Sequence, residues 1–397
     1  MSHSVESGLS AGKLESLQKA IRTEGLDGWL FCNFRHRDKL SDEILGLPDS
    51  SNSRFWFYAV PASGDPVKII HSVEPDSLNI LPGKKIFYIG RDDLKNALKL
   101  LAGKTWGVHS SEYLPAISYL DSGTAALLKE SGLCLVSAGS LIQRFYSLLD
   151  ANAIKAHENA AVHLYEIVKV AWDFVRDSYK NKNELYEGDI RRLMNDEMQR
   201  RGIVSQRDLI IAAGKGSGNP HYNFSGRGNL VKEGDLVQFD LWARENFSGS
   251  VFADISWAGV YSDKIPSEAE KRFAAVVAAR EGAFDFIQGE LSKGRNPKGS
   301  DVDIKAREII IGSGYGSGIK HRTGHGIDVE IHGSGVNMDS VEFPDSRQIL
   351  EGSCFSLEPG IYFDDYGMRT EVDVYVWDGK AHVSGSPHER QYSLLHC

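Results

Sequence analysis

Five side chains with metal-binding chemistry gather in two stretches of the chain. QFDLWARENFSGSVFADISW supplies two aspartates, and KHRTGHGIDVEIHG, FSLEPGIY and MRTEVDVYV supply a histidine and two glutamates. The five candidates are Asp240, Asp254, His325, Glu358 and Glu371. Carboxylates with one imidazole suit divalent ions such as Mn²⁺, Co²⁺ or Zn²⁺. Four carboxylates would over-supply a single ion with negative charge, so two bridged metal ions are the more economical interpretation, and a water between them is a hydrolytic nucleophile.

Each candidate taken singly has a structural alternative. The aspartates could cap turns, and His325 could be a buried, hydrogen-bonded histidine. The set favours a metal centre, because Asp240 and Glu358 lie in strongly apolar, strand-like runs, where an unpaired charge costs several kcal/mol. Lys320 and Arg369 are basic residues that lie close by in sequence. The acids therefore need further cations.

The elements that must position these residues follow an α/β order. The five ligand candidates fall on runs that we predict to be strands, and the chain after about residue 323 is predicted to return to strands. Amphipathic patterns predict helices at about 155–179, 189–199, 267–288 and 301–311. We predict two similar α/β halves around one sheet, in a domain spanning 151–397.

Residues 1–150 form a separate pattern of alternating strands and helices, which predicts a self-contained α/β domain. Its helices are expected at about 11–25 and 122–131, and its strands at 85–89, at 105–108 and in a hairpin around residues 63–66. We find no catalytic cluster in this domain.

Composition narrows the class of protein. The chain has 397 residues, 41% of them hydrophobic, and a net charge of −9 without a basic stripe. We therefore expect a globular protein that does not bind nucleic acid. No apolar run has the length of a signal peptide or a membrane span, which predicts no membrane partner and a cytoplasmic location. Four dispersed cysteines without a CxxC motif are expected to be structural thiols.

Two other patterns are excluded as functional motifs. AAGKGSGN and IGSGYGSG match neither phosphate-binding glycine pattern. HENAAVH, which begins at His157, fails the HExxH spacing, and we interpret its His157-Glu158 pair as a solvated helix face.

At this point the sequence resembles a known family. The motifs are GNPHY with His221, the aspartate pair, GHGIDVEIH with His332, LEPGIYF and MRTEVDV. They are similar to those of the pita-bread metallopeptidases, which include methionine aminopeptidase, aminopeptidase P and prolidase. The resemblance covers about residues 154–392, and the first 150 residues look like the creatinase/prolidase-type domain. It implies an α/β N-terminal domain followed by a catalytic pita-bread domain.

The resemblance also implies a division of roles. Asp254 and Glu371 would bridge two metal ions, Asp240 would complete one site, and His325 with Glu358 would complete the other. Glu358 would take a proton from the bridging water. His221 and His332 would line the cleft and assist proton movement, although each could instead be a hydrogen-bonding group behind the ligands.

Two departures from the family pattern stand out. The interval of fourteen residues between Asp240 and Asp254 is a few residues longer than usual, which places a small insertion, ENFSGS, in a hairpin turn that should tolerate it. Gly333 follows His332, where many relatives carry an acidic residue. The ligand set survives both changes, and substrate preference is the property that they affect.

The additional N-terminal domain favours the proline-directed branch of the family. Chain length favours prolidase, an Xaa-Pro dipeptidase that hydrolyses a small peptide with proline after the scissile bond. Such an enzyme needs a cation for the free carboxylate, for which Arg369 and Arg347 are the candidates. The alternatives are an aminopeptidase P acting on longer peptides, a creatinase-like hydrolase or lyase, and a metal-free binding module. The family habit implies a homodimer.

Overall fold

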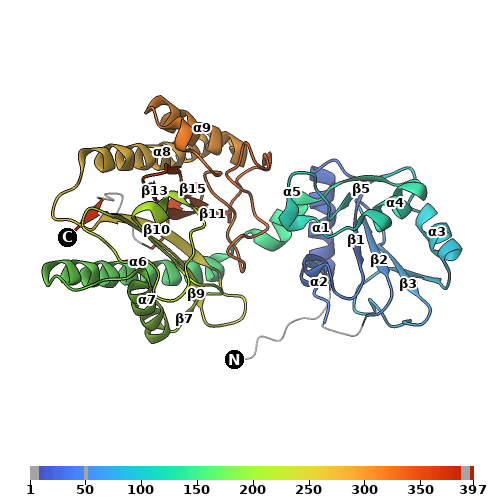
Figure 1. Ribbon diagram of the computed structural model, residues 1–397. Helices are drawn as coiled ribbons and strands as arrows, with labels where there is room; N and C mark the ends of the chain where they lie inside the picture. The colour runs from blue at the N-terminus through green and yellow to red at the C-terminus, as the bar shows by residue number, and fades with distance from the viewer. Residues whose placement is uncertain (1–8, 49–51, 386–393) are drawn as a thin grey trace. The chain divides into compact units, whose positions relative to one another are not determined.

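The computed structural model describes residues 9–48, 52–385 and 394–397. Contacts divide the chain into two compact units, Met1–Tyr146 and Ser147–Cys397. Each unit has its own sheets and its own hydrophobic clusters (Figure 1). Among the described residues, no helix is long and apolar enough to cross a membrane.

The first unit is a mixed sheet with helices on both faces. Its strand order is β4-β3-β2-β1-β5-β6. The strands are β1 (Gly28–Asn33), β2 (Trp56–Pro61), β3 (Val67–His71), β4 (Lys84–Tyr88), β5 (Thr105–Val108) and β6 (Cys134–Ser137). The helices are α1 (Ala11–Thr23), α2 (Lys39–Leu45), α3 (Arg91–Lys99), α4 (Ser122–Glu130) and α5 (Gly139–Ile142). The hairpin predicted around residues 63–66 is confirmed as the antiparallel β2–β3 pair. Gly64 in its turn has a positive φ, a left-handed conformation that glycine adopts without strain.

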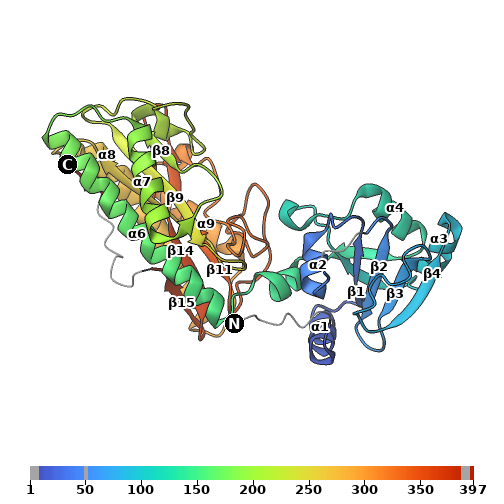
Figure 2. The same ribbon diagram turned by 90° about the horizontal axis from the view of Figure 1, so that it is seen from below.

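In the second unit one pair of helices, α6 and α7, lies on one side of the strands, and a second pair, α8 and α9, lies on the other side, as Figures 1 and 2 show. The helices are α6 (Ala151–Lys180), α7 (Glu187–Arg201), α8 (Ser267–Leu291) and α9 (Gly299–Gly312). The carboxylate of Asp150 caps α6 by accepting from the backbone N–H groups of Asn152 and Ala153. One hydrophobic cluster joins α6 and α7 to β9 and β10, and another joins α8 and α9 to the strands near the C-terminus.

The strands that the structure describes in the second unit form three sheets. Five strands make the first: β7 (Ile203–Val204), β8 (Ile210–Ala213), β9 (Leu236–Glu245), β10 (Ala253–Val260) and β16 (Leu395–His396). The others are β11 (Cys354–Leu357) with β14 (Val372–Trp377) and β15 (Lys380–Val383), and the pair β12 (Gly360–Tyr362) with β13 (Gly367–Arg369). We predicted one sheet. Instead, the five-stranded sheet meets the β14 strand at an isolated antiparallel bridge between Ser256 and Glu371.

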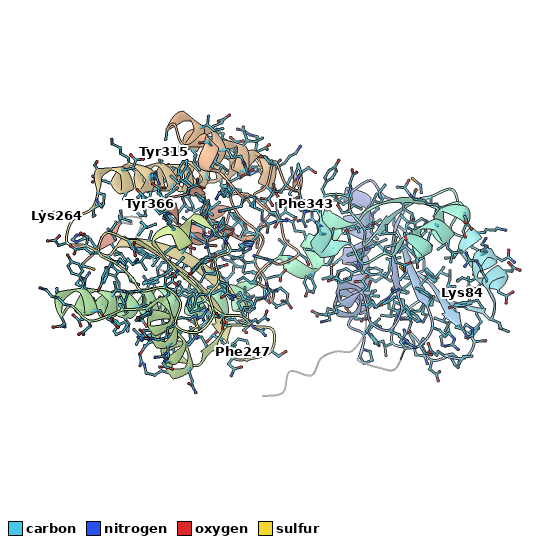
Figure 3. All side chains as sticks on the ribbon, viewed as in Figure 1. Lys84, Phe247, Lys264, Tyr315, Phe343 and Tyr366 are labelled. Atoms are coloured by element: carbon cyan, nitrogen blue, oxygen red, sulfur yellow. The ribbon has the colours of Figure 1, made fainter. Side chains whose placement is uncertain are left out.

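The predicted insertion lies in the loop between β9 and β10, residues 246–252. The loop turns through Gly249, which has a positive φ of 82°, and Ser250 donates to the carbonyl of Glu245 at its base. Phe247 at the tip is 53% exposed (Figure 3). The extra residues therefore leave the register of the hairpin intact.

Residues 319–353 contain no helix or strand among those that the structure describes, so the expectation of strands directly after about residue 323 is wrong for this segment. Much of this backbone is nevertheless buried, and buried N–H groups need acceptors. Four buried aspartates supply them: Asp303, Asp328, Asp339 and Asp345. Carboxylates thus replace the predicted ladder: Asp303 reaches in from α9, and the other three aspartates accept from N–H groups within eight residues of their own positions.

The interpretation of His157 as part of a solvated face is also wrong. His157 is fully buried in α6, where its ring contacts the carbonyl of Phe252 and the hydroxyl of Ser384. A histidine with partners from two other elements can occupy the apolar face of a helix without an unsatisfied nitrogen.

Candidate metal centre

The β9–β10 hairpin brings three polar side chains onto one face. Asp240 lies opposite Ser256 in the antiparallel register, and Asp254 is two residues before Ser256 on the same strand. Because side chains alternate with a period of two, all three point to the same side of the sheet. Glu371 pairs with Ser256 from the other side, so Asp240, Ser256 and Glu371 form a row across three strands.

The remaining candidates approach from the irregular segment and from β11. Glu358 follows β11, and its backbone N–H donates to the carbonyl of Thr323 at 2.7 Å. His325 lies two residues after Thr323. Its backbone N–H donates to the hydroxyl of Ser356 at 3.0 Å, which fixes the position of His325. His325 Nε2 is then 3.5 Å from Glu358 Oε1 and 3.7 Å from Asp254 Oδ2.

The structure brings all five sequence-predicted ligands together. One donor atom each from Asp254, His325 and Glu371 lies within 4.8 Å of the other two. Asp240 joins Glu371 through the Ser256 hydroxyl, at 3.0 Å and 2.7 Å from the respective carboxylate oxygens. Long-range packing, rather than sequence proximity, makes this cluster.

The electrostatics of the cluster favour a bound cation. Burial and the nearby carboxylates of Glu371 and Asp240 raise the pKa of Asp254 well above its ordinary value. Burial and neighbouring acids do the same for Glu371, and burial raises the pKa of Glu358 to about 7. Burial lowers the pKa of His325 far below its ordinary value, leaving a neutral ring that can ligate. In the described chain Asp254 Oδ1 is buried without a hydrogen-bond donor, and a divalent ion fits this donor set.

Arg369 organises the carboxylates. Its guanidinium pairs with Asp240, donates to Ser256 Oγ at 2.9 Å and donates to Tyr362 Oη at 3.1 Å. Burial works against its charge, but Asp240 and the other acids outweigh burial and raise the pKa of Arg369. The side chain is thus engaged with the ligand cluster.

Arg347, the other arginine predicted to bind a substrate carboxylate, is committed elsewhere. Its buried guanidinium binds Asp345 and the carbonyls of Ser334 and Gly335 at 2.6 Å each. Its guanidinium donors are therefore engaged within the protein.

Two histidines predicted to line the cleft are exposed. The ring of His332 stands edge-on to His325, with centroids 4.3 Å apart. One side of the His332 ring is exposed to solvent. Burial of its other side and the charge of Arg322 lower the pKa of His332 to about 4. His221 follows the 214–218 turn.

Our sequence reasoning missed His321 and Tyr362. His321 Nδ1 is 2.7 Å from the carbonyl of Arg322, which only accepts, so Nδ1 carries the proton. Burial and the charge of Arg369 lower the pKa of His321 to about 3, so Nε2 accepts from Tyr362 Oη at 2.8 Å. A chain of hydrogen bonds therefore runs from His321 through Tyr362 and Arg369 to Asp240.

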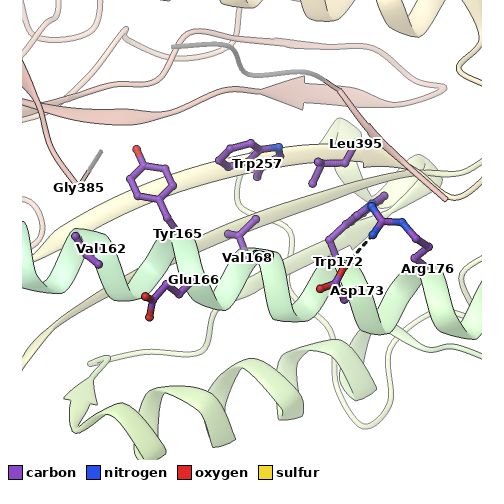
Figure 4. Close-up of a pocket in the computed structure, with 11 residues that line it drawn as sticks. Val162, Tyr165, Glu166, Val168, Trp172, Asp173, Arg176, Trp257, Gly385 and Leu395 are labelled. Atoms are coloured by element: carbon purple, nitrogen blue, oxygen red, sulfur yellow. Dashed lines mark hydrogen bonds and ion pairs between the residues drawn. The ribbon is translucent and has the colours of Figure 1, made fainter. Parts of the chain in front are cut away.

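A hollow elsewhere in this unit is separate from the cluster. It encloses about 540 Å³ and is lined by Tyr165, Trp172 and Arg176 of α6 and by Trp257 of β10 (Figure 4). Strand alternation points Trp257 away from the face that carries Asp254 and Ser256.

This fold has known counterparts across its whole length. Dipeptidase PepE from Mycobacterium ulcerans superposes with a TM-score of 0.72 at 20% identity, covering 100% of this chain and 99% of that one. The architecture is an N-terminal α/β domain followed by a pita-bread domain, as predicted.

The family follows from the sequence match. Residues 151–378 match metallopeptidase family M24, and the chain belongs to this family. It is 29% identical over 252 residues to the putative dipeptidase YkvY of Bacillus subtilis, covering 62% of each chain. It is 32% identical over 177 residues to an Xaa-Pro dipeptidase of Lactobacillus delbrueckii subsp. lactis, covering 44% of each. The chain thus matches less than two thirds of the length of these relatives.

Proposed function

We propose that this protein is a dinuclear-metal hydrolase that cleaves the peptide bond before proline, acting as an Xaa-Pro dipeptidase. The observation that carries the proposal is the buried cluster of four carboxylates and His325 around a single guanidinium. The similarity to a putative dipeptidase and to an Xaa-Pro dipeptidase supports the choice of substrate.

The five ligands divide as the family resemblance implies. Asp254 and Glu371 would be shared by two ions, Asp240 would complete one site, and His325 and Glu358 would complete the other. Bound divalent ions polarise the scissile carbonyl and acidify the attacking water. The oxygen-rich ligand set is compatible with Mn²⁺, Co²⁺ and Zn²⁺.

Glu358 is the proposed proton acceptor because it is the most accessible of the four acids. Its side chain is 14% exposed, against 9% for Asp240, 6% for Asp254 and 2% for Glu371. A group that exchanges a proton with a water must be reached by that water. The exposed imidazoles of His221 and His332 are proposed to line the substrate side and assist the proton transfer.

Arg322 is the proposed ligand for the free carboxylate of the dipeptide, since Arg369 and Arg347 are engaged. It is partly exposed, and its guanidinium has no hydrogen bond or ion pair among the described residues. It adjoins Thr323, which pairs with Glu358, and its charge reaches both Glu358 and His332. A free guanidinium beside the cluster is suited to a carboxylate.

A peptide panel tests the proposal. Metal-free protein is reloaded with Mn²⁺, Co²⁺ or Zn²⁺ in turn and assayed on Ala-Pro, Ala-Pro-amide and Ala-Pro-Ala. We expect Ala-Pro to be the best substrate. Fast cleavage of the tripeptide with little dipeptide turnover would identify an Xaa-Pro aminopeptidase instead, and no turnover with no bound metal would identify a binding module.

Two substitutions test the assigned roles. Glu358→Gln should reduce kcat at least about 100-fold with the fold unchanged by circular dichroism. Arg322→Ala should raise KM about tenfold for Ala-Pro and leave Ala-Pro-amide unaffected, since a charge-assisted bond to the carboxylate is lost. Arg207→Ala, which removes another arginine charge near His332, is the matched control.

We also propose a homodimer, on the family resemblance. Mass measurement by light scattering tests this directly.

A further inference from the structure

A buried carboxylate interrupts the strand pairing directly behind the cluster. Glu371 N–H donates to the carbonyl of Ser256 at 3.3 Å, which makes one antiparallel rung between β14 and β10. In this register the next rung would join Asp254 and Asp373. The carbonyl of Asp373 is already occupied, because it accepts from Ser384 N–H at 3.0 Å.

The side chain of Asp373 fills the missing rung. Its Oδ2 accepts the backbone N–H of Asp254 at 2.7 Å. Asp373 is fully buried, so this N–H has no access to water as an alternative partner. At Asp373 one edge of β14 changes its neighbouring strand from β15 to β10. The Asp373 carboxylate accepts the β10 N–H that has no backbone acceptor at this position.

His157 clamps the two strands at the same level. One ring nitrogen, Nδ1, must carry a proton because it is 2.6 Å from the carbonyl of Phe252, two residues before Asp254. The other, Nε2, is 2.7 Å from Ser384 Oγ and 3.8 Å from Asp373 Oδ2. The ring is therefore tied both to the strand of Asp254 and to the residue that engages the Asp373 carbonyl.

Asp254 depends on this support more than the other acids do. The carboxylate of Glu371 accepts from the Ser256 hydroxyl, the carboxylate of Asp240 pairs with Arg369, and Glu358 is contacted by Ser356 at 3.3 Å. In the described residues, the carboxylate of Asp254 accepts no hydrogen bond, and its Oδ1 is buried without a partner. Only its backbone is fixed locally.

We infer that Asp373, clamped by His157, is a positioning residue that aims Asp254 at the metal ions through the backbone N–H of Asp254. The inference rests on the proposed role of Asp254 as a bridging ligand. Groups behind metal ligands commonly change affinity 10- to 100-fold when removed, because the ligand loses its orientation.

Metal binding by the full chain tests this inference without an activity assay. Mn²⁺ is titrated calorimetrically into metal-free wild type, Asp373→Leu and Asp373→Asn. Leucine fills similar space but accepts no hydrogen bond, so we expect the Kd for Mn²⁺ to rise about 10- to 100-fold. Asparagine keeps an acceptor oxygen and should raise Kd by less. Asp373→Ala gives the same comparison if the leucine variant does not fold.

The matched control is Asp339→Asn. Asp339 is also fully buried and accepts backbone N–H groups, from Val341, Glu342 and Phe343, but it touches no ligand candidate. We expect less than about a twofold change in its Kd, even if its melting temperature falls. A purely structural role for Asp373 would lower melting temperature and leave Kd unchanged, which would overturn the inference.

Asp254→Asn separates this inference from the proposed function. If wild type binds Mn²⁺ and Asp254→Asn weakens binding while Asp373→Leu does not, the inference fails and the metal centre stands. If Asp254→Asn has no effect, or wild type binds no Mn²⁺, the proposed centre and the inference both fail.

Discussion

Ser256 carries one hydroxyl proton among three charged neighbours. Its Oγ lies 2.7 Å from Glu371, 3.0 Å from Asp240 and 2.9 Å from the Nε of Arg369. A hydroxyl donates once and accepts from Arg369, so it can satisfy only one of the two acids at a time. The shorter distance assigns that bond to Glu371, and Asp240 relies on Arg369.

Ser256→Ala should therefore weaken metal binding without unfolding the hairpin. We expect a Kd for Mn²⁺ about tenfold higher, because Glu371 loses its orienting donor. Ser250→Ala is the control, since Ser250 is equally buried at the base of the same hairpin but donates only to carbonyls of the loop. Equal effects of the two substitutions on Kd would refute the role of the Ser256 hydroxyl.

At the scale of elements, one glutamate of α7 holds the segment that carries His221. The buried carboxylate of Glu187 accepts from Ala213 N–H at 2.8 Å, Tyr222 Oη at 3.0 Å and Asn229 N–H at 2.6 Å. These three hydrogen bonds hold the chain before and after His221 in sequence. The His221 side chain makes no hydrogen bond among the described residues, and a helix that begins 34 residues earlier in the sequence thus places it.

Glu187→Gln should reduce kcat/KM for Ala-Pro about 10- to 100-fold, because the amide cannot accept at all three points and His221 shifts. Metal affinity should be unchanged, since Glu187 touches no ligand. Glu197→Gln on the same helix, which breaks the exposed pair with Arg200, is the control. Loss of activity together with loss of metal would indicate general unfolding instead.

The loop that carries His332 gives a pH prediction. Asp328 accepts from Glu330 N–H and Ser334 N–H at 2.9 Å each, and burial raises its pKa to about 6 from 3.8. The folded protein therefore holds this proton more tightly than the unfolded chain. As pH rises from about 4 to about 6 the unfolded chain ionises first, and the folded state loses up to about 3 kcal/mol from this group.

Asp328→Asn cannot ionise and should lack this loss. Urea unfolding of metal-free protein at pH 4.5 and pH 7 should show wild type losing stability relative to the variant as pH rises. A constant difference between the two proteins across this range would contradict the raised pKa of Asp328.

At the scale of the whole molecule, metal should stabilise one unit and not the other. All five ligand candidates lie in Ser147–Cys397, and a ligand stabilises what it binds by about 2.7 kcal/mol at one hundred times Kd. Hydrogen exchange with Mn²⁺ should slow amides of β9 and β10 and leave those of β1 and β2 unchanged. Equal protection of both pairs would show that the two units unfold together.

The chain itself determined the chemistry and most of the regular elements. The runs around Asp240 and Asp254 were predicted to be strands and are β9 and β10, because a local pattern of residue types is readable without tertiary contacts. The long helices α6 and α8 were predicted from their apolar stripes for the same reason. Residue type alone indicated a divalent metal site.

Only the tertiary structure decided which partner each polar group takes. The guanidinium of Arg369 reaches Asp240 across 129 residues of sequence, and His157 finds Ser384 across 227. The irregular path of residues 319–353 depends on aspartates that substitute for strand neighbours. Charge and hydrogen-bond partners are set by distances in space, so a local pattern could name the ligands but not their supports.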